Sequence, residues 1–367
     1  MMEKIKEFMA NSSVETDALL ASFAITIVLG LIIIPLLKKL HIGQVVREDG
    51  PKTHLGKKGT PTMGGIIMLV AIMVVSVGVS FKYPSVLPVA CITLGYGIIG
   101  FLDDFIKLVL KNPKGLKPSL KMLGLIIVAT GFVIYLTHNP DLATASSLDH
   151  QVEVEGMEHS VQDDSVDDVL SLDKGHGMNK KMDMYIPIFK TTVSIPTWIY
   201  IPFAVFVILA CTNSLNLTDG LDGLASGVTA IIMIFFAIAS IKMGNKDMAA
   251  FSAIVTGTTI AFLFFNAHPA RVFMGDTGSL ALGGAFCSVA LMLKMPLILI
   301  VVAGICVAEA VSVILQVSYF KITKGKRLFK MAPLHHHFEL CGVKETVIVP
   351  AFWGVTVVLC ILGLLMI

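Results

Sequence analysis

The stretch that decides the fold is ALLASFAITIVLGLIIIPLL at residues 18–37, where twenty consecutive residues carry no charged side chain. A helix of about 20 apolar residues spans the hydrocarbon core of a bilayer. Ten such runs can be drawn along the chain, at residues 18–37, 63–81, 85–102, 119–137, 197–212, 223–241, 249–265, 278–293, 297–320 and 347–367. The runs are continuous rather than alternating, which argues against a barrel. The sequence therefore predicts an all-α polytopic integral membrane protein with about ten transmembrane helices.

The composition of the 367 residues indicates the same class. Apolar residues make up 55% of the chain and charged residues 15%, whereas soluble domains contain about 25% charged residues. The net charge of +2 excludes a basic nucleic-acid-binding protein, so we expect no nucleic acid partner. The six cysteines form neither a CxxC pair nor a zinc-type spacing, which argues against a disulfide or zinc scaffold.

Lysine and arginine are concentrated in the odd-numbered gaps between runs. The gap after the third run contains five lysines, whereas the gap after the second contains only Lys82. By the positive-inside rule, the odd-numbered gaps are cytoplasmic and both termini are extracytoplasmic. Residues 139–195 form an acidic extracytoplasmic insert, which we expect to be a solvated and partly disordered loop. We expect one transmembrane domain over residues 1–367.

Acidic residues gather in three motifs on the predicted cytoplasmic side. FLDDFIK at 101–107 contains Asp103 and Asp104, with Lys107 on the same helix face as Asp103. Carboxylates there can bind Mg²⁺ or accept a proton, and a water-facing ion pair is the alternative. FNAHPARVFMGDTGS at 265–279 contains Asp276, which either caps a helix or holds a metal ion beside phosphate oxygens.

The third motif, NSLNLTDGLDGLASG at 213–227, has polar residues at every third position: Asn213, Asn216, Asp219 and Asp222. A helical turn would line these side chains along one face. Gly220 and Gly223 allow a ligand to approach the backbone closely. The alternative is an ordinary Asp-Gly turn between two spans.

Basic and histidine-rich stretches lie on the same predicted side. KGKRLFKMAPLHHHFEL at 324–340 contains three successive histidines, which cannot all address one ion from a regular element. Beside basic residues they suit a phosphate-rich ligand. HLGKKGTPTMGG at 54–65 adds Lys57 and Thr62. Glu309 lies inside the ninth run and is either functional or a partner for a polar group on another helix.

These clusters predict a membrane-facing site for Mg²⁺ and a polyphosphate, with a sugar nucleotide and a lipid phosphate as a natural substrate pair. The chain has no G-x-x-x-x-G-K-[ST] loop, so ATP hydrolysis is not indicated.

The strings PTMGG, DDFIK, NSLNLTDGLDGLA, FMGDTGSLALGG and KRLFKMAPLHHHFEL occur in this order. Together they closely resemble the phospho-N-acetylmuramoyl-pentapeptide transferase family, within the polyprenyl-phosphate N-acetylhexosamine-1-phosphate transferase superfamily. The resemblance implies Mg²⁺-dependent transfer of phospho-MurNAc-pentapeptide from UDP-MurNAc-pentapeptide to undecaprenyl phosphate. The products would be lipid I and UMP, in the first membrane step of peptidoglycan synthesis. It also implies a multi-pass protein of the bacterial cytoplasmic membrane with its active site on the cytoplasmic face. A homodimer is among the oligomeric states left open.

The resemblance also implies roles for individual residues. Asp276 would be the Mg²⁺ ligand, and Asp103 would accept the proton of the lipid phosphate, with Asp104 beside it. Asp219 would be a further acid of the reaction centre, and His336 a further catalytic candidate. The expected substrate-binding residues toward the uridine are Asn216, Gly220, Leu221, Asp222, Asn266 and Phe273, with Lys107 close by. Asn213 is a further expected substrate-binding residue. Those expected toward the diphosphate and amino sugar are Lys57, Thr62, His335, His336 and His337. Direct transfer and a covalent intermediate on Asp276 are both left open.

Two alternatives remain at this stage. A sister transferase acting on UDP-N-acetylglucosamine and undecaprenyl phosphate would share the acidic motifs but usually lacks the histidine string. A lipid-linked sugar transporter would place ionisable groups near the bilayer midplane, often in inverted repeats, whereas here they gather toward one surface.

Overall fold

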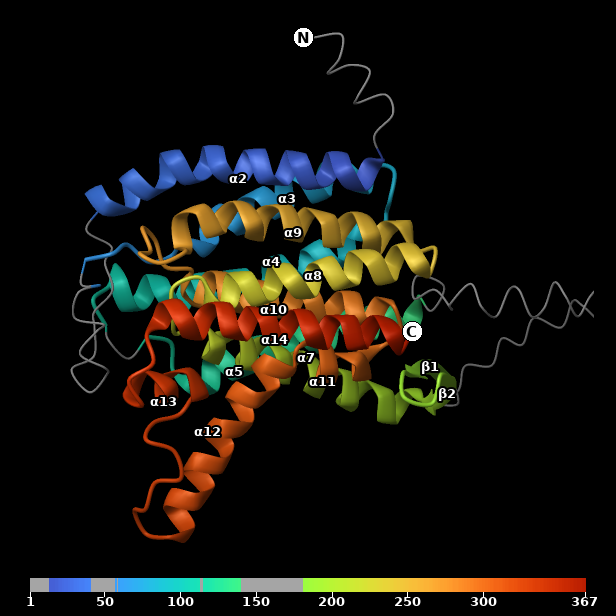
Figure 1. The fold of residues 1–367 in the computed structure, drawn as a ribbon. Helices are drawn as coiled ribbons and strands as arrows, with labels where there is room; N and C mark the ends of the chain where they lie inside the picture. The colour runs from blue at the N-terminus through green and yellow to red at the C-terminus, as the bar shows by residue number, and fades with distance from the viewer. Residues whose placement is uncertain (1–12, 41–56, 58, 113–114, 140–180) are drawn as a thin grey trace, which may run out of the picture.

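Long apolar helices lying side by side account for most of the computed structural model, which describes residues 13–40, 57, 59–112, 115–139 and 181–367 (Figure 1). In chain order the helices of the bundle are α2 (Val14–Lys39), α3 (Gly65–Ser80), α4 (Val86–Leu108), α5 (Pro118–His138), α7 (Thr197–Thr218), α8 (Leu224–Lys242), α9 (Lys246–Asn266), α10 (Gly275–Met292), α12 (Gly304–Ile322) and α14 (Glu345–Leu365). Two short helices, α11 (Leu299–Val302) and α13 (Leu334–Leu340), flank α12.

The predicted all-α membrane architecture is confirmed. Within the described residues, eight helices are long and apolar enough to cross a bilayer. Two more, α3 with 16 residues and α10 with 18, occupy the second and eighth predicted runs. Each predicted run therefore has a helical counterpart, and the chain is a multi-pass membrane protein.

The ninth run was predicted as one span over 297–320, and this prediction was wrong. A 3-10 turn, η3 (Pro296–Ile298), leads into α11, and the chain leaves helical geometry at Ala303, with φ −97° and ψ 24°. Helix α12 then begins at Gly304 and leans away from the bundle (Figure 1). Hydrophobicity alone could not locate this break, because the run stays apolar on both sides of it.

The acidic insert ends in a β-hairpin rather than a loop, so the loop prediction was wrong for residues 181–196. Strands β1 (Lys181–Ile186) and β2 (Thr191–Pro196) pair antiparallel, with Lys181 opposite Pro196. Tyr185 N–H donates to Lys294 O at 2.8 Å, which ties the hairpin to the loop after α10. Residues 140–180 of the insert lie outside the described residues. The hairpin and α13 lie at opposite ends of the bundle (Figure 1).

Helix α10 forms the centre of the bundle, and its residues from Thr277 to Met292 are all buried. It packs closely on α4 and α3 through glycines. A methyl group on Gly100 would overlap the carbonyl of Asp276, and one on Gly65 would overlap the backbone of Gly278. This close approach brings the carboxyl end of α4 beside the amino end of α10.

Candidate functional site

Asp103 and Asp276 form the centre of a charged cluster at the end of the bundle that carries α13. Lys107 Nζ lies 2.8 Å from Asp103 Oδ2 and 3.0 Å from Asp276 Oδ2. Lys121 Nζ, from α5, lies 3.0 Å and 2.7 Å from the same two oxygens. Leu116 N–H and the Asn216 side-chain amide donate to the second oxygens of Asp103 and Asp276, each at 2.8 Å. Two carboxylates from different helices therefore share two ammonium groups.

The oxygen donors of this cluster fit a hard divalent cation. Carboxylate and amide oxygens are the ligands that Mg²⁺ prefers. Asp103, whose side chain is 4% exposed, and Asp276, at 18%, meet closely enough to share the ammonium groups of Lys107 and Lys121. The same two carboxylate oxygens could therefore share a metal ion in place of an ammonium.

Asp104 points to the amino end of α10. Its Oδ2 accepts hydrogen bonds from Thr277 N–H at 2.9 Å and from Thr277 Oγ1 at 2.7 Å, and its Oδ1 accepts from Asp276 N–H at 3.2 Å. The first N–H groups of a helix have no partner within the helix. Asp104 therefore caps α10 from a different helix and fixes the backbone that carries Asp276.

The DGLDG turn at 219–223 separates α7 from α8. The prediction that four polar residues line one helical face was wrong, because α7 ends at Thr218 and Gly223 has a left-handed φ of 78°. Asp219 follows the end of α7. Burial raises the pKa of the Asp219 carboxyl to about 8, and the charges of Asp276, Asp104 and Asp222 act in the same direction. The charges of these three acids thus reach the Asp219 carboxyl from α4, from α10 and from the turn itself.

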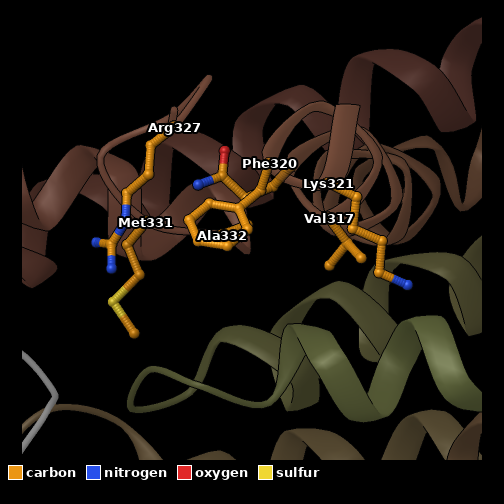
Figure 2. A pocket seen from close by; sticks show the side chains of 7 residues that line it. Val317, Phe320, Lys321, Arg327, Met331 and Ala332 are labelled. Carbon is orange, nitrogen blue, oxygen red and sulfur yellow. The ribbon is translucent and has the colours of Figure 1, made fainter. Parts of the chain in front are cut away.

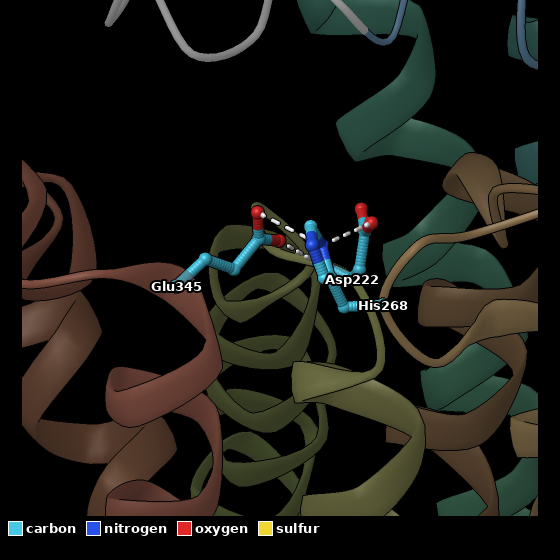
Figure 3. Close-up of side chains that lie close together, drawn as sticks. All are labelled: Asp222, His268 and Glu345. Carbon is cyan, nitrogen blue, oxygen red and sulfur yellow. Dashed lines mark hydrogen bonds and ion pairs between the residues drawn. The ribbon is translucent and has the colours of Figure 1, made fainter.

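Asp222, His268 and Glu345 lie close together (Figure 3). With Lys57 they form a second cluster. Lys57 Nζ lies 2.6 Å from Asp222 Oδ1 and 2.8 Å from Glu345 Oε1, and His268 Nδ1 lies 3.2 Å from Asp222 Oδ2. Ligand atoms of Asp222, His268 and Glu345 lie within 4.8 Å of one another, an arrangement that can hold a metal ion. In this structure the Lys57 ammonium supplies the positive charge between the two carboxylates.

The loop before α3 pairs with the loop before α10. Phe273 N–H donates to Pro61 O, and Gly64 N–H donates to Phe273 O, both at 2.8 Å. This pairing fixes Phe273, whose ring centroid lies 6.0 Å from Lys57 Nζ. Thr62 is buried in the same loop, next to the turn at Gly275. Lys57, Thr62 and Phe273 thus lie close together, although the sequence placed Phe273 toward the uridine and Lys57 and Thr62 toward the diphosphate and amino sugar.

The three successive histidines point to three different partners from α13. His335 is fully buried, with Nδ1 3.3 Å from Glu309 Oε2 and its ring beside Gly220. His336 Nδ1 lies 2.8 Å from Glu339 Oε2, and His337 Nδ1 accepts from Lys330 N–H at 3.2 Å. Glu309 is therefore the partner of a polar group on another helix, one of the two roles considered for it. His335 faces the turn that carries Asp219 and Asp222.

Three predicted binding residues hold the fold together in this structure. Asn213 donates to Leu209 O of its own helix at 2.7 Å. Asn266 accepts from Ser226 Oγ at 2.7 Å and donates to Val272 O at 3.0 Å, which shapes the loop before Phe273. Leu221 is buried in the DGLDG turn.

Sequence reasoning did not assign roles to Lys121, His268 and Glu345. Lys121 was one of five lysines in its gap, and only the packing of α5 shows that it reaches both acids. His268 belongs to the motif at 265–279, in which the expected roles fell to Asn266, Phe273 and Asp276. Glu345 follows Lys344 just before the last apolar run and lies 123 positions from Asp222 in sequence. An acid directly at the end of a predicted span is the signal that could have identified it.

A groove of about 360 Å³ lies between α12 and the segment that follows it (Figure 2). Its lining residues are Gln316, Val317, Phe320, Lys321, Arg327, Met331 and Ala332. Lys321 and Arg327 add two positive charges to a mainly apolar wall. The groove has the chemistry to hold an apolar ligand with an anionic end.

The fold and the site define a polytopic helical membrane protein with buried carboxylates and lysines gathered at one end. Residues 86–294 match glycosyl transferase family 4. The phospho-N-acetylmuramoyl-pentapeptide-transferase of Acetivibrio thermocellus is 47% identical over 354 residues, which cover 96% of this chain and 95% of that protein. The protein of that name from Caldicellulosiruptor bescii is 43% identical, over 95% of this chain and 96% of its own length. The one from Clostridium botulinum (strain Eklund 17B) is 42% identical, over 99% of each chain.

The chain therefore belongs to glycosyl transferase family 4 and, within it, to the phospho-N-acetylmuramoyl-pentapeptide-transferases. The resemblance drawn from the sequence motifs is confirmed.

Proposed function

We propose that this protein transfers phospho-MurNAc-pentapeptide from UDP-MurNAc-pentapeptide to undecaprenyl phosphate and yields lipid I and UMP. The observation that carries the proposal is the Asp103–Asp276 pair, which shares the ammonium groups of Lys107 and Lys121. Such a site can bring anionic oxygens together, which is the main difficulty of exchanging one phosphoanhydride for another. The relatives' printed name supports this reaction over the two alternatives.

Asp103 is the proposed acceptor of the lipid phosphate's proton. Two ammonium groups and one backbone N–H donate to it in this structure. Phosphate oxygens would compete for the ammonium groups of Lys107 and Lys121. As these donors turn toward the phosphates, the Asp103 carboxylate can take the proton while the lipid oxygen attacks the β-phosphorus of the nucleotide and UMP leaves.

Mg²⁺ is the proposed cofactor, with Asp276 as its ligand and Asp103 close enough to contribute. When bound, the ion would offset negative charge on the diphosphate. Asn216 and the Asp104 cap would hold Asp276 in place for this role.

The proposed active site faces the cytoplasm of a bacterial cell. Lys107, Lys111, Lys117 and Lys121 lie in the stretch from the end of α4 to the start of α5, at the end of the bundle that carries the site. By the positive-inside rule, this concentration of lysines supports a cytoplasmic position. Both termini would then be extracytoplasmic, and residues 1–367 would act as one transferase domain. A homodimer is compatible with this arrangement.

A UMP-release assay on purified protein tests the proposal. We expect UMP only when UDP-MurNAc-pentapeptide, undecaprenyl phosphate and Mg²⁺ are all present. UDP-N-acetylglucosamine in place of the first nucleotide should release no UMP. Release with that nucleotide would favour the sister transferase, and failure to release UMP from the complete mixture would reject the proposed reaction.

A further inference from the structure

The first residue of α14 joins two parts of the site that come from distant stretches of the chain. Glu345 Oε1 accepts a hydrogen bond from Asp222 N–H at 2.6 Å and lies 2.8 Å from Lys57 Nζ. The side chains of Lys57 and Glu345 are only 14% and 10% exposed. One carboxylate oxygen therefore fixes both the DGLDG turn and the lysine of the loop before α3.

The surroundings of Glu345 give it a fixed position. Helix α14 packs on α8 where Trp353 lies against Gly227, and a methyl group on Gly227 would overlap the indole ring. Helix α8 begins directly after the DGLDG turn. Glu345 is the first residue of α14, and the turn leads into α8. The packing of these two helices therefore fixes the position of Glu345 relative to the turn.

The Lys57 ammonium is held between two carboxylates, which account for two of its N–H donors. Among the described residues, Lys57 Nζ donates to Asp222 Oδ1 and to Glu345 Oε1. A lysine ammonium has three N–H donors, so a further donor can meet a phosphate oxygen. Charge-assisted hydrogen bonds of this kind are stronger than neutral ones, and a pair shielded from water is screened less than a surface pair.

We propose that Glu345 is a positioning residue for the uridine nucleotide. It holds the backbone of Asp222 and orients the Lys57 ammonium toward the diphosphate, without touching the reacting atoms itself. This inference rests on the proposed function, because it takes a uridine nucleotide as the ligand of the turn.

Two variants separate the two contacts. Glu345→Gln keeps an oxygen that can accept from Asp222 N–H but loses the negative charge beside Lys57. Glu345→Ala loses both. We expect Glu345→Gln to raise the KM for UDP-MurNAc-pentapeptide about fivefold to tenfold with kcat within twofold of the parent. Glu345→Ala should raise this KM further and also lower kcat, because the turn also carries Asp219.

Asp247→Asn is the matched control, because Asp247 Oδ2 accepts from Ser85 N–H at 2.8 Å at the far end of the bundle. It should lower the thermal midpoint without changing KM. Calorimetric titration with UMP should show the same order of affinities: parent, then Glu345→Gln, then Glu345→Ala.

The inference is overturned if Glu345→Ala keeps a KM and a UMP affinity within twofold of the parent, or if Asp247→Asn raises KM equally. Failure of the proposed function would show differently, as a parent protein that releases no UMP at all.

Discussion

Asp103 on α4 and Asp276 on α10 lie 173 positions apart in sequence, yet their Oδ2 atoms contact the same two lysine ammonium groups. Each carboxylate is paired with Lys107 from α4 and with Lys121 from α5. The pair exists because α10 approaches α4 closely at Gly100. The site therefore depends on the packing of the two helices as much as on the acids themselves.

Substitution of either acid by its amide should abolish most of the activity. Asp103→Asn removes the proposed proton acceptor, and Asp276→Asn removes the proposed metal ligand. We expect each to lower kcat in the UMP-release assay by about 10²-fold or more, within the range seen when general-base catalysis or charge stabilisation is lost. A kcat within threefold of the parent for either variant would remove that residue from its proposed role.

Lys121→Met should separate the need for positive charge from the need for metal. The variant leaves Lys107 alone between two carboxylates, so we expect kcat to fall by about 10-fold to 10²-fold. The Mg²⁺ concentration that gives half-maximal thermal stabilisation should also fall, because one competing cation has been removed. Lys117→Met removes an exposed charge from the same gap and is the control. An unchanged Mg²⁺ requirement in Lys121→Met would contradict the competition.

The spans other than the ninth could be predicted from the sequence, and so could part of the charged site. Asp103 and Lys107 are four positions apart on one helix, so their contact follows from helical geometry and is confirmed. Lys121 could not be chosen among its neighbours, because its role depends on how α5 packs on α4. The position of Asp222 was mispredicted, since the threefold spacing continues past Thr218, where α7 ends. Contacts between distant segments, such as Glu345 with Asp222, carry no local signal.

Gly100→Ala should inactivate the protein without changing any charged group. The added methyl group would overlap the carbonyl of Asp276 and push α10 away from α4. We expect kcat to fall by at least 10-fold and the thermal midpoint to fall with it. Gly131→Ala on α5 places the same methyl group where nothing lies within 4 Å, so it should behave like the parent in both measurements. Equal activity of the two variants would show that the close approach is not required.

Asp219 should make stability depend on pH. Its pKa is raised to about 8, above an ordinary value of about 3.9, so the folded protein binds a proton that the unfolded chain releases. Its contribution to stability is present at low pH and is lost as pH rises through about 8. In Mg²⁺-free detergent, the thermal midpoint of the parent should therefore fall from pH 6 to pH 9. Asp219→Asn should remove most of this fall, a difference on the order of 5 °C at pH 9. Parallel curves would exclude this titration.

The pair of His335 and Glu309 gives a last test, on stability rather than activity. Both side chains are almost fully buried, at 1% and 0% exposed, with His335 Nδ1 3.3 Å from Glu309 Oε2. His335→Ala leaves Glu309 buried without its imidazole, and removal of one member of a buried pair costs about 3–5 kcal/mol. Glu309→Gln added to His335→Ala replaces the carboxyl group that has lost its partner with a neutral amide, so the double variant should melt at a higher temperature than His335→Ala alone. His337→Ala, whose histidine faces a backbone N–H instead of an acid, should lower the midpoint less. If the second substitution lowers the midpoint further, the two residues are not coupled in this way.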